Sequence, residues 1–216
     1  MIEATKKEQR NQVRSRLCAL GVEHQEAAGS QVANHLKTWL MNLRMPLRFA
    51  LYVGVGHEIR TGAVDKLLKE FGHHRCYPRV DSQKMRFFEI PPAINASEMQ
   101  KGSFGIPEPP CSGWVEKSLE NIDIILMPAL LVSPLGHRLG QGGGFYDRLI
   151  ASSCSLQTPP PFVALIMDEQ IVEKIPHDPA WDQRIDGIIS PKGCHWTRTE
   201  ASFYRHPINN LLAPKP

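Results

Sequence analysis

One ten-residue run, residues 123–132 (DIILMPALLV), constrains the fold of this chain more than any other segment. It is almost continuously apolar, which is typical of a strand whose sheet is covered on both faces. Shorter apolar runs of the same kind predict further buried strands at residues 48–55, 162–167 and 187–190. Such strands are buried when helices cover both sides of their sheet.

Helices are predicted between these runs. T-K-K-E at residues 5–8 is a capping-box pattern, and Gly21 is suited to end the helix that begins there. The helices cover residues 6–20, 23–42, 61–72 (with Thr61 as N-cap and Gly72 as C-cap) and 146–152, with short strands at 74–78 and 85–90 and a long loop over 91–113. This alternation predicts an α/β fold with a parallel or mostly parallel central sheet.

The 216 residues suffice for one sizeable core, and we expect one domain over residues 1–196 with an appendage over residues 197–216. The net charge of +3, without a long basic run, does not indicate nucleic acid as a partner. Five scattered cysteines without a CxxC pair are typical of free thiols in a reducing compartment. The charged N-terminus lacks a secretory apolar segment, and no run is long enough to cross a bilayer. We therefore expect a cytoplasmic protein without a membrane partner, and a monomer.

The segment RLGQGGGFYD, residues 138–147, lies between a predicted buried strand and a predicted helix. Its glycines permit positive φ and remove side chains that would block a ligand. Successive backbone N–H groups can form an anion site there, together with the N-terminus of the next helix. Arg138 can contact phosphate oxygens, and Asp147, in the first helical turn, could hold a hydrated magnesium ion close to phosphate.

This segment matches neither common nucleotide fingerprint. A Walker A motif needs a lysine and a hydroxyl after the glycines, and a GxGxxG motif fails because Phe145 occupies the last glycine position. A tight structural turn remains an alternative. The first helix favours the phosphate site, because Lys6 and Arg10 fall on the same face as its apolar stripe. The alternative for these two cations is that their stems cover apolar surface while their charges reach solvent.

Weaker candidates lie elsewhere along the chain. Glu58 comes after a predicted strand and could accept two hydrogen bonds from an aminopyrimidine edge, or be a surface charge. Asp182 and Asp186 come before the last predicted strand and could be a helix cap and a solvated charge. His73 and His74 are interpreted as surface residues, since no third metal ligand lies at a suitable spacing. No cysteine or serine is proposed as a nucleophile, and no catalytic residue is assigned.

The ordered motifs resemble those of the 5-formyltetrahydrofolate cyclo-ligase family, also called methenyltetrahydrofolate synthetases. The resemblance runs from Lys6 to about Ser190. Its pieces are K-K-E-Q-R at 6–10, H-E-I-R-T at 57–61, Y-P-R-V at 77–80, G-S-F-G-I-P-E-P at 102–109, M-P-A-L-L-V-S-P-L-G-H-R-L-G-Q-G-G-G-F-Y-D-R at 127–148, E-Q-I-V-E-K-I-P at 169–176 and W-D-Q-R-I-D-G-I-I-S at 181–190.

This resemblance implies the role of each site residue. ATP would be bound by Lys6, Arg10, Arg138, Leu139, Gly140, Gln141, Gly142, Gly143, Gly144, Phe145 and Tyr146. The folate would contact Val53, Glu58, Phe104 and the stretch from Gln141 to Phe145, and Mg²⁺ would be associated with Asp147 and Asp182. The implied fold is a three-layer α/β sandwich of the phosphosugar-isomerase and CoA-transferase type.

The implied reaction converts 5-formyltetrahydrofolate and ATP into 5,10-methenyltetrahydrofolate, ADP and phosphate. Phosphorylation of the formyl oxygen would make it a leaving group, and N10 would then close the ring. The chain departs from the family at Val132-Ser133, where Phe-Asp is usual. That departure supports a rival interpretation, a non-catalytic folate- or nucleotide-binding protein. A second rival, suggested by fold analogy alone, is an isomerase or transferase that acts on a phosphorylated metabolite.

Overall fold

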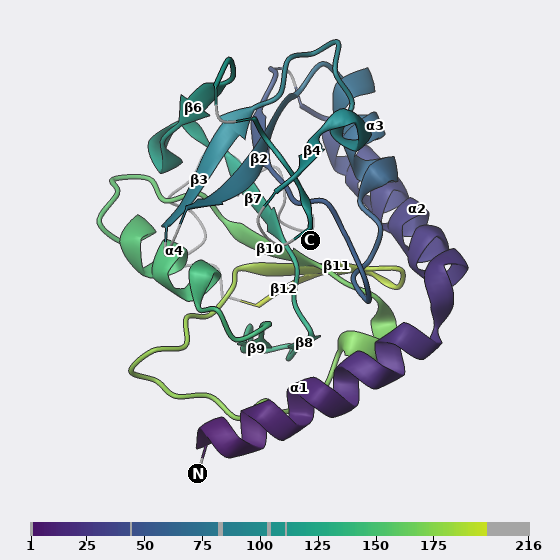
Figure 1. Ribbon diagram of the computed structural model, residues 1–216, viewed down its shortest axis with the longest axis vertical. Helices are drawn as coiled ribbons and strands as arrows, with labels where there is room; N and C mark the ends of the chain where they lie inside the picture. The colour runs from purple at the N-terminus through teal and green to yellow at the C-terminus, as the bar shows by residue number, and fades with distance from the viewer. Residues whose placement is uncertain (1, 44, 82–83, 103–104, 111, 198–216) are drawn as a thin grey trace.

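The computed structural model describes residues 2–43, 45–81, 84–102, 105–110 and 112–197. The strands of its central sheet are β1 (Arg48–Ala50), β2 (His74–Asp81), β3 (Lys84–Glu89), β6 (Val115–Lys117), β7 (Ile124–Met127), β10 (Phe162–Leu165), β11 (Gly187–Ser190) and β12 (Gly193–Trp196). Across the sheet their order is β12-β11-β10-β7-β1-β2-β3-β6 (Figure 1). The five strands from β11 to β2 are parallel, whereas β12, β3 and β6 pair antiparallel with their neighbours. The predicted mostly parallel sheet is confirmed.

Helices cover both faces of this sheet. They are α1 (Ile2–Ala19), α2 (Gly21–Leu40), α3 (Gly62–Glu70) and α4 (Phe145–Ser153), with short 3₁₀ helices η1 (Ala96–Glu98), η2 (Leu119–Asn121) and η3 (Asp168–Gln170). In β7, Ile124 and Leu126 pack with the helices α1–α3, while Ile125 and Met127 pack with α4. This alternation reflects the two-residue period of a strand, and it explains why the run is apolar at every position.

The apolar run contains two strands rather than one. β7 ends before Pro128, which has no N–H to give to a ladder. The chain then leaves the main sheet, and β8 (Leu131–Val132) pairs antiparallel with β9 (Arg138–Leu139). This separate hairpin leads directly into the glycine-rich segment. A further small pair, β4 (Gln100–Lys101) with β5 (Pro107–Glu108), lies within the predicted long loop.

Other predictions need correction. The strand predicted at residues 48–55 is a ladder only over β1, after which the chain turns toward α3. His73 is buried rather than on the surface, and its Nδ1 accepts a hydrogen bond from the Leu47 N–H at 3.0 Å. Thr61 does precede α3, but its hydroxyl bonds to the Tyr52 carbonyl instead of capping the helix. The edge strands β6 and β12 were not predicted.

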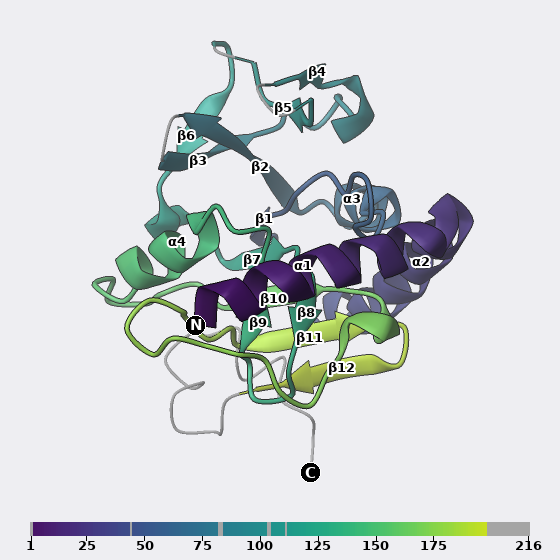
Figure 2. The ribbon, with the colours of Figure 1, turned by 60° about the horizontal axis from the view of Figure 1, so that its bottom comes forward.

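α1 lies across the front of the molecule in Figure 2, and hydrogen bonds from Arg10 and Arg14 join it to the glycine-rich segment. Among the described residues, no helix combines the length and the apolar character needed to cross a bilayer. The expected C-terminal appendage, apart from Thr197, lies outside the described residues.

Candidate active site

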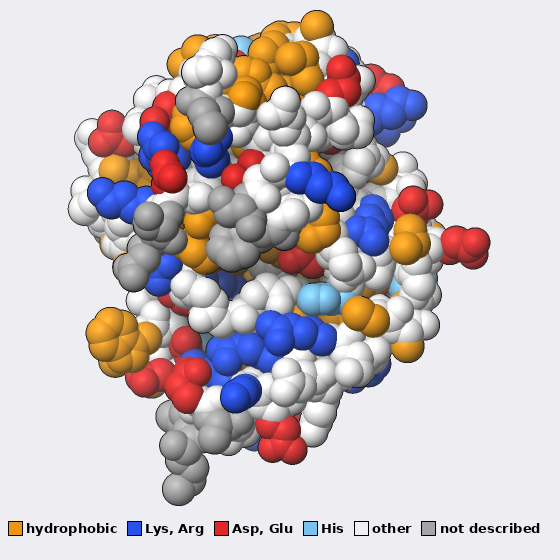
Figure 3. Space-filling view, in the orientation of Figure 1, with side chains coloured by type: hydrophobic (Ala, Val, Ile, Leu, Met, Phe, Trp, Pro, Cys, Tyr) orange, Lys and Arg blue, Asp and Glu red, His pale blue; other side chains and the backbone are white. Residues whose placement is uncertain are grey.

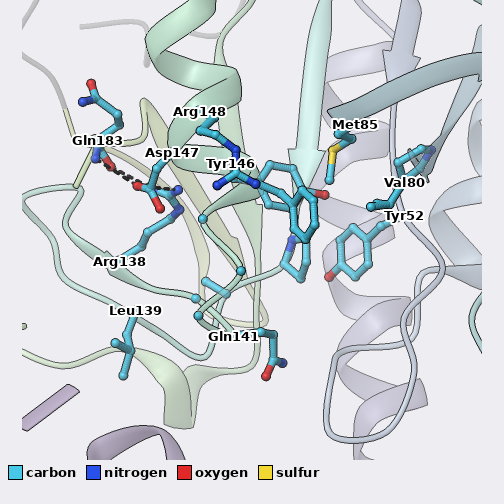
Figure 4. Close-up of a pocket in the computed structure, with 18 of the residues that line it drawn as sticks. Tyr52, Val80, Met85, Arg138, Leu139, Gln141, Tyr146, Asp147, Arg148 and Gln183 are labelled. Carbon is cyan, nitrogen blue, oxygen red and sulfur yellow. Dashed lines mark hydrogen bonds and ion pairs between the residues drawn. The ribbon is translucent and has the colours of Figure 1, made fainter. Parts of the chain in front are cut away.

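One cavity of about 900 Å³ lies at the carboxyl ends of β1 and β7. Open α/β sheets commonly bind ligands in this position. Figure 4 shows its two different sides: Arg138, Asp147 and Gln183 form a charged side, while Tyr52, Val80 and Met85 lie on the other. The described site residues predicted from the sequence all line it, namely Lys6, Arg10, Val53, Glu58, the residues from Arg138 to Asp147, and Asp182. Phe104 lies outside the described residues.

The glycine-rich segment forms the floor between these two sides. Gly142 and Gly144 have φ of 103° and 64°. Residues that carry a side chain rarely adopt such positive φ values. Gly144 is also the N-cap of α4, so this helix begins beside the cavity with its positive end nearby. Arg10 Nε donates to the Gly140 carbonyl at 3.1 Å and so holds the segment from the side of α1. Gly143 has no such φ, but a Cβ there would lie 2.8 Å from the Phe145 ring.

We expect Gly142→Ala to impair turnover more than stability. Alanine at this φ should cost about 1–3 kcal/mol of backbone strain, and displacing the loop by about 1 Å can lower a rate by about 10²-fold. Gly72→Ala is the matched control, because Gly72 also has a positive φ of 72° and lies after α3, away from the cavity. Thermal melting and steady-state kinetics should show similar stability losses but a rate loss only for Gly142→Ala. Equal turnover in both variants would contradict the role of the loop.

Arg138, on β9, links the charged side together by contacting both Gln183 and Asp147. Its side chain is only 4% exposed, Nη1 donates to the Gln183 carbonyl at 2.6 Å, and Nη2 lies 2.9 Å from Asp147 Oδ1. Gln183 N–H also donates to Asp147 Oδ1, at 3.0 Å. The guanidinium therefore faces the cavity from a fixed position, with further N–H groups suited to phosphate oxygens.

Lys6, on α1, belongs to the same charged side and is 4% exposed. Its Nζ is 2.5 Å from Asp182 Oδ2, which also accepts the Asp178 N–H at 2.6 Å. Burial raises the pKa of Asp182, but the hydrogen bonds from Lys6 and Asp178 outweigh it and hold this pKa below its usual value. The lysine charge thus stays inside the protein rather than reaching solvent, and Asp182 is an ion-pair partner rather than a helix cap. Figure 3 shows further Lys and Arg side chains in a row at the edge of a hollow beside α1.

Asp147 and Asp182 are suited to a magnesium ion that arrives with phosphate. Within the described part of the chain, the contacts of Asp147 use Oδ1 and those of Asp182 use Oδ2, so each carboxylate keeps one oxygen for another ligand. No group of three or more His, Cys, Asp or Glu side chains among the described residues is placed to hold a metal ion. Magnesium needs only one or two carboxylates when phosphates and waters complete its shell.

Glu58 is the main ionisable group that we assign to the other side of the cavity. Its Oε2 accepts the Val55 N–H at 3.2 Å, and the Gln141 side chain, which also lowers the pKa of this carboxylate, lies nearby. Burial raises the pKa of Glu58 from 4.5 to about 7, although these contacts and Arg60 oppose the rise. Burial and the charge of Glu58 also raise the pKa values of Tyr52 and Tyr146. A carboxyl group among aromatic and aliphatic side chains suits a flat heterocycle with an N–H edge.

Several cavity residues were not predicted. Tyr52 comes after β1, and Pro128 and Ala129 come after β7, so the strand-end rule that identified Glu58 could have found them. Val80, Met85 and Glu108 come from β2, β3 and β5, and only the tertiary structure brings these strands to the cavity. Ser133 is buried but is not among the described residues that line the cavity. The departure noted at this position in the sequence therefore lies outside the described cavity wall.

The described lining contains no serine, threonine, cysteine or histidine side chain. Its polar groups include cations, carboxylates, the Tyr52 and Tyr146 hydroxyls and backbone N–H groups. Such a set can position and neutralise phosphates, which is the main requirement of phosphoryl transfer.

Comparisons with known proteins identify the family of this chain. The model of the 5-formyltetrahydrofolate cyclo-ligase family matches residues 2–191. A 5-formyltetrahydrofolate cyclo-ligase of Mycolicibacterium smegmatis is 30% identical over 77% of this chain and 86% of the relative, and one of Escherichia coli is 28% identical over 83% and 96%. The solved 5,10-methenyltetrahydrofolate synthetase of Aquifex aeolicus has the same fold, with a TM-score of 0.70 at 24% identity over 94% of this chain and 97% of that one. The chain therefore belongs to the 5-formyltetrahydrofolate cyclo-ligase family.

Proposed function

We propose that this chain catalyses the ATP-dependent cyclisation of 5-formyltetrahydrofolate to 5,10-methenyltetrahydrofolate, with release of ADP and phosphate. One observation carries the proposal beyond family membership. A single cavity has Lys6 and Arg138 on one side, Glu58 on the other, and the glycine-rich segment between them. This arrangement lets a polyphosphate and a pterin lie in one space, as transfer between them requires.

The phosphate side is built for charge neutralisation. Lys6, Arg10 and Arg138 would contact the phosphates, and the N–H groups of the segment from Leu139 to Tyr146 would add uncharged donors. Asp147 and Asp182 would hold Mg²⁺, which supplies positive charge to the phosphates when bound. The phosphates could come close to the backbone N–H groups here, because Gly142, Gly143 and Gly144 carry no side chains.

The folate side would orient the formyl group. Glu58 would accept hydrogen bonds from the aminopyrimidine edge, and Val53 and Tyr52, which also line the cavity, would pack against the ring. The formyl oxygen is a poor leaving group until the γ-phosphoryl group is transferred to it. N10 can then attack the activated carbon, and departure of phosphate leaves the methenyl bridge. The expected cytoplasmic location and monomeric state belong to this proposal and rest on the sequence.

A coupled assay tests the proposal against its rivals. ADP release and methenyl absorbance are followed together, with 5-formyltetrahydrofolate either present or omitted. We expect ADP release that depends strictly on 5-formyltetrahydrofolate and matches methenyl formation one to one. Binding of both ligands without turnover would instead indicate a non-catalytic binding protein, and turnover of a phosphorylated metabolite alone would indicate an isomerase or transferase.

A further inference from the structure

Ring closure releases a proton that the cavity has to accept. When N10 attacks the activated carbon, a C–N bond forms and N10 becomes positively charged while it still carries its hydrogen. Loss of this proton leaves an electron pair on nitrogen. That pair then expels phosphate as the C–O bond breaks, and the methenyl cation remains. A general base close to N10 is therefore required on the folate side.

The described lining offers five carboxylates and no imidazole. Asp147 is paired with Arg138, and Asp182 with Lys6. Glu3 has a 75% exposed side chain at the rim, where it lies 3.4 Å from Lys6. Glu58 already accepts a hydrogen bond from the Val55 N–H.

Glu108 differs from the other four. It lies on β5 and is 8% exposed, and within the described part of the chain no hydrogen bond or ion pair engages its carboxylate. Its neighbours along the cavity wall are apolar: Pro78, Val80, Met85, Ile106 and Pro107. Burying a carboxylate without a hydrogen-bonding or charged partner costs free energy, so most buried carboxylates have one. Glu108 is unusual because its neighbours on this wall supply none.

The surrounding chain keeps this carboxylate in place. A Cβ at Gly102 would lie 2.2 Å from Glu108 Oε2, so the absence of a side chain at Gly102 leaves room for the carboxylate. Arg79 Nη1 donates to the Pro109 carbonyl at 3.1 Å and anchors the segment after β5 to β2. Burial raises the pKa of Glu108, with Asp81 adding to the rise and Arg79 opposing it. A base with a raised pKa accepts a proton more readily.

We infer that Glu108 is the catalytic base that takes the N10 proton during ring closure. The inference rests on the proposed function and assigns Glu108 to a step after phosphoryl transfer. Glu58 then serves to bind the pterin, and the two glutamates have separate roles on one side of the cavity.

Positional isotope exchange separates this step from phosphoryl transfer. ATP labelled with oxygen-18 in the β–γ bridge is incubated with enzyme, Mg²⁺ and 5-formyltetrahydrofolate. Reversible transfer of the γ-phosphoryl group scrambles the label, which phosphorus NMR detects. For Glu108→Gln we expect methenyl formation to fall by about 10²-fold or more, since general bases contribute about 10²–10⁴-fold. Exchange should persist at or above the wild-type rate.

Glu26→Gln, at an exposed position on α2, is the control and should change neither measurement. Persistent exchange in Glu108→Gln would also show that the variant is folded and binds both substrates. Normal methenyl formation in this variant, or exchange that falls in parallel with it, would overturn the assignment. If wild-type enzyme forms no methenyl product, the proposed function itself is wrong, which is a separate outcome.

Discussion

Replacing Arg138 by glutamine should lower the affinity for ATP by at least about 10²-fold. The variant loses a guanidinium that faces the cavity, and charged hydrogen bonds contribute about 1.5–3 kcal/mol each. It also leaves the Asp147 carboxylate, 2.9 Å from Arg138 in the wild type, to repel the phosphates. Removing one partner of a buried ion pair commonly costs about 3–5 kcal/mol, and Asp147 is partly exposed, so the loss of unfolding free energy should lie toward the low end.

A double variant distinguishes ligand binding from stability. Arg138→Gln with Asp147→Asn replaces the ion pair by two amides that can bond to each other, so the melting temperature should largely recover. ATP affinity, measured by calorimetry without magnesium, should not recover, because the cation is still missing. Wild-type affinity in the double variant would show that Arg138 only supports the fold.

Glu58→Gln should have opposite effects on stability and on folate binding. The pKa of Glu58 is about 7 in the folded chain, against its ordinary value of 4.5. As pH rises from about 4.5 to 7, the unfolded chain gives up this proton first, so the unfolding free energy falls. Above about pH 7 the full penalty of about 3 kcal/mol is present. Glutamine cannot ionise, so the variant should be more stable than wild type at about pH 8 and similar to it below about pH 5.

Folate affinity of the same variant should fall by about tenfold or more, while ATP affinity stays within a few-fold. A neutral amide offers the pterin edge a weaker acceptor than a carboxylate does. Denaturant unfolding at both pH values and calorimetry with each ligand provide the measurements, with Glu26→Gln as an exposed control. Equal losses of both ligands, or an unfolding free energy that is the same function of pH in variant and wild type, would contradict the role of Glu58.

The sequence predicted those parts of the site that depend on local pattern. The glycine-rich segment between strand and helix is readable because its residues are contiguous, and Lys6 and Arg10 are readable because helical periodicity puts them on the buried face of α1. Glu108 was not predicted as a site residue, since it reaches the cavity only because the β4–β5 hairpin is held against β2. The burial of His73 was missed for a similar reason: its partner is a backbone N–H at Leu47, 26 residues away.

The division of the long apolar run into β7 and β8 shows another limit of prediction from sequence. Hydrophobicity alone predicts one strand, and only Pro128 signals where β7 ends. This break has a functional consequence, because the hairpin of β8 and β9 aims Arg138 into the cavity. The antiparallel edge strands β6 and β12 are short and mostly exposed, so they lack the apolar signal that identified the inner strands.

In the proposed reaction, the γ-phosphoryl group of ATP is transferred to the formyl oxygen of the folate within this cavity. The most direct test uses 5-formyltetrahydrofolate whose formyl oxygen is oxygen-18, with unlabelled ATP and unlabelled water. Mass spectrometry of the released phosphate should show one oxygen-18 atom in each phosphate formed with a methenyl product. Phosphate without the label would contradict the proposal, because the formyl oxygen would then have left the folate by another route.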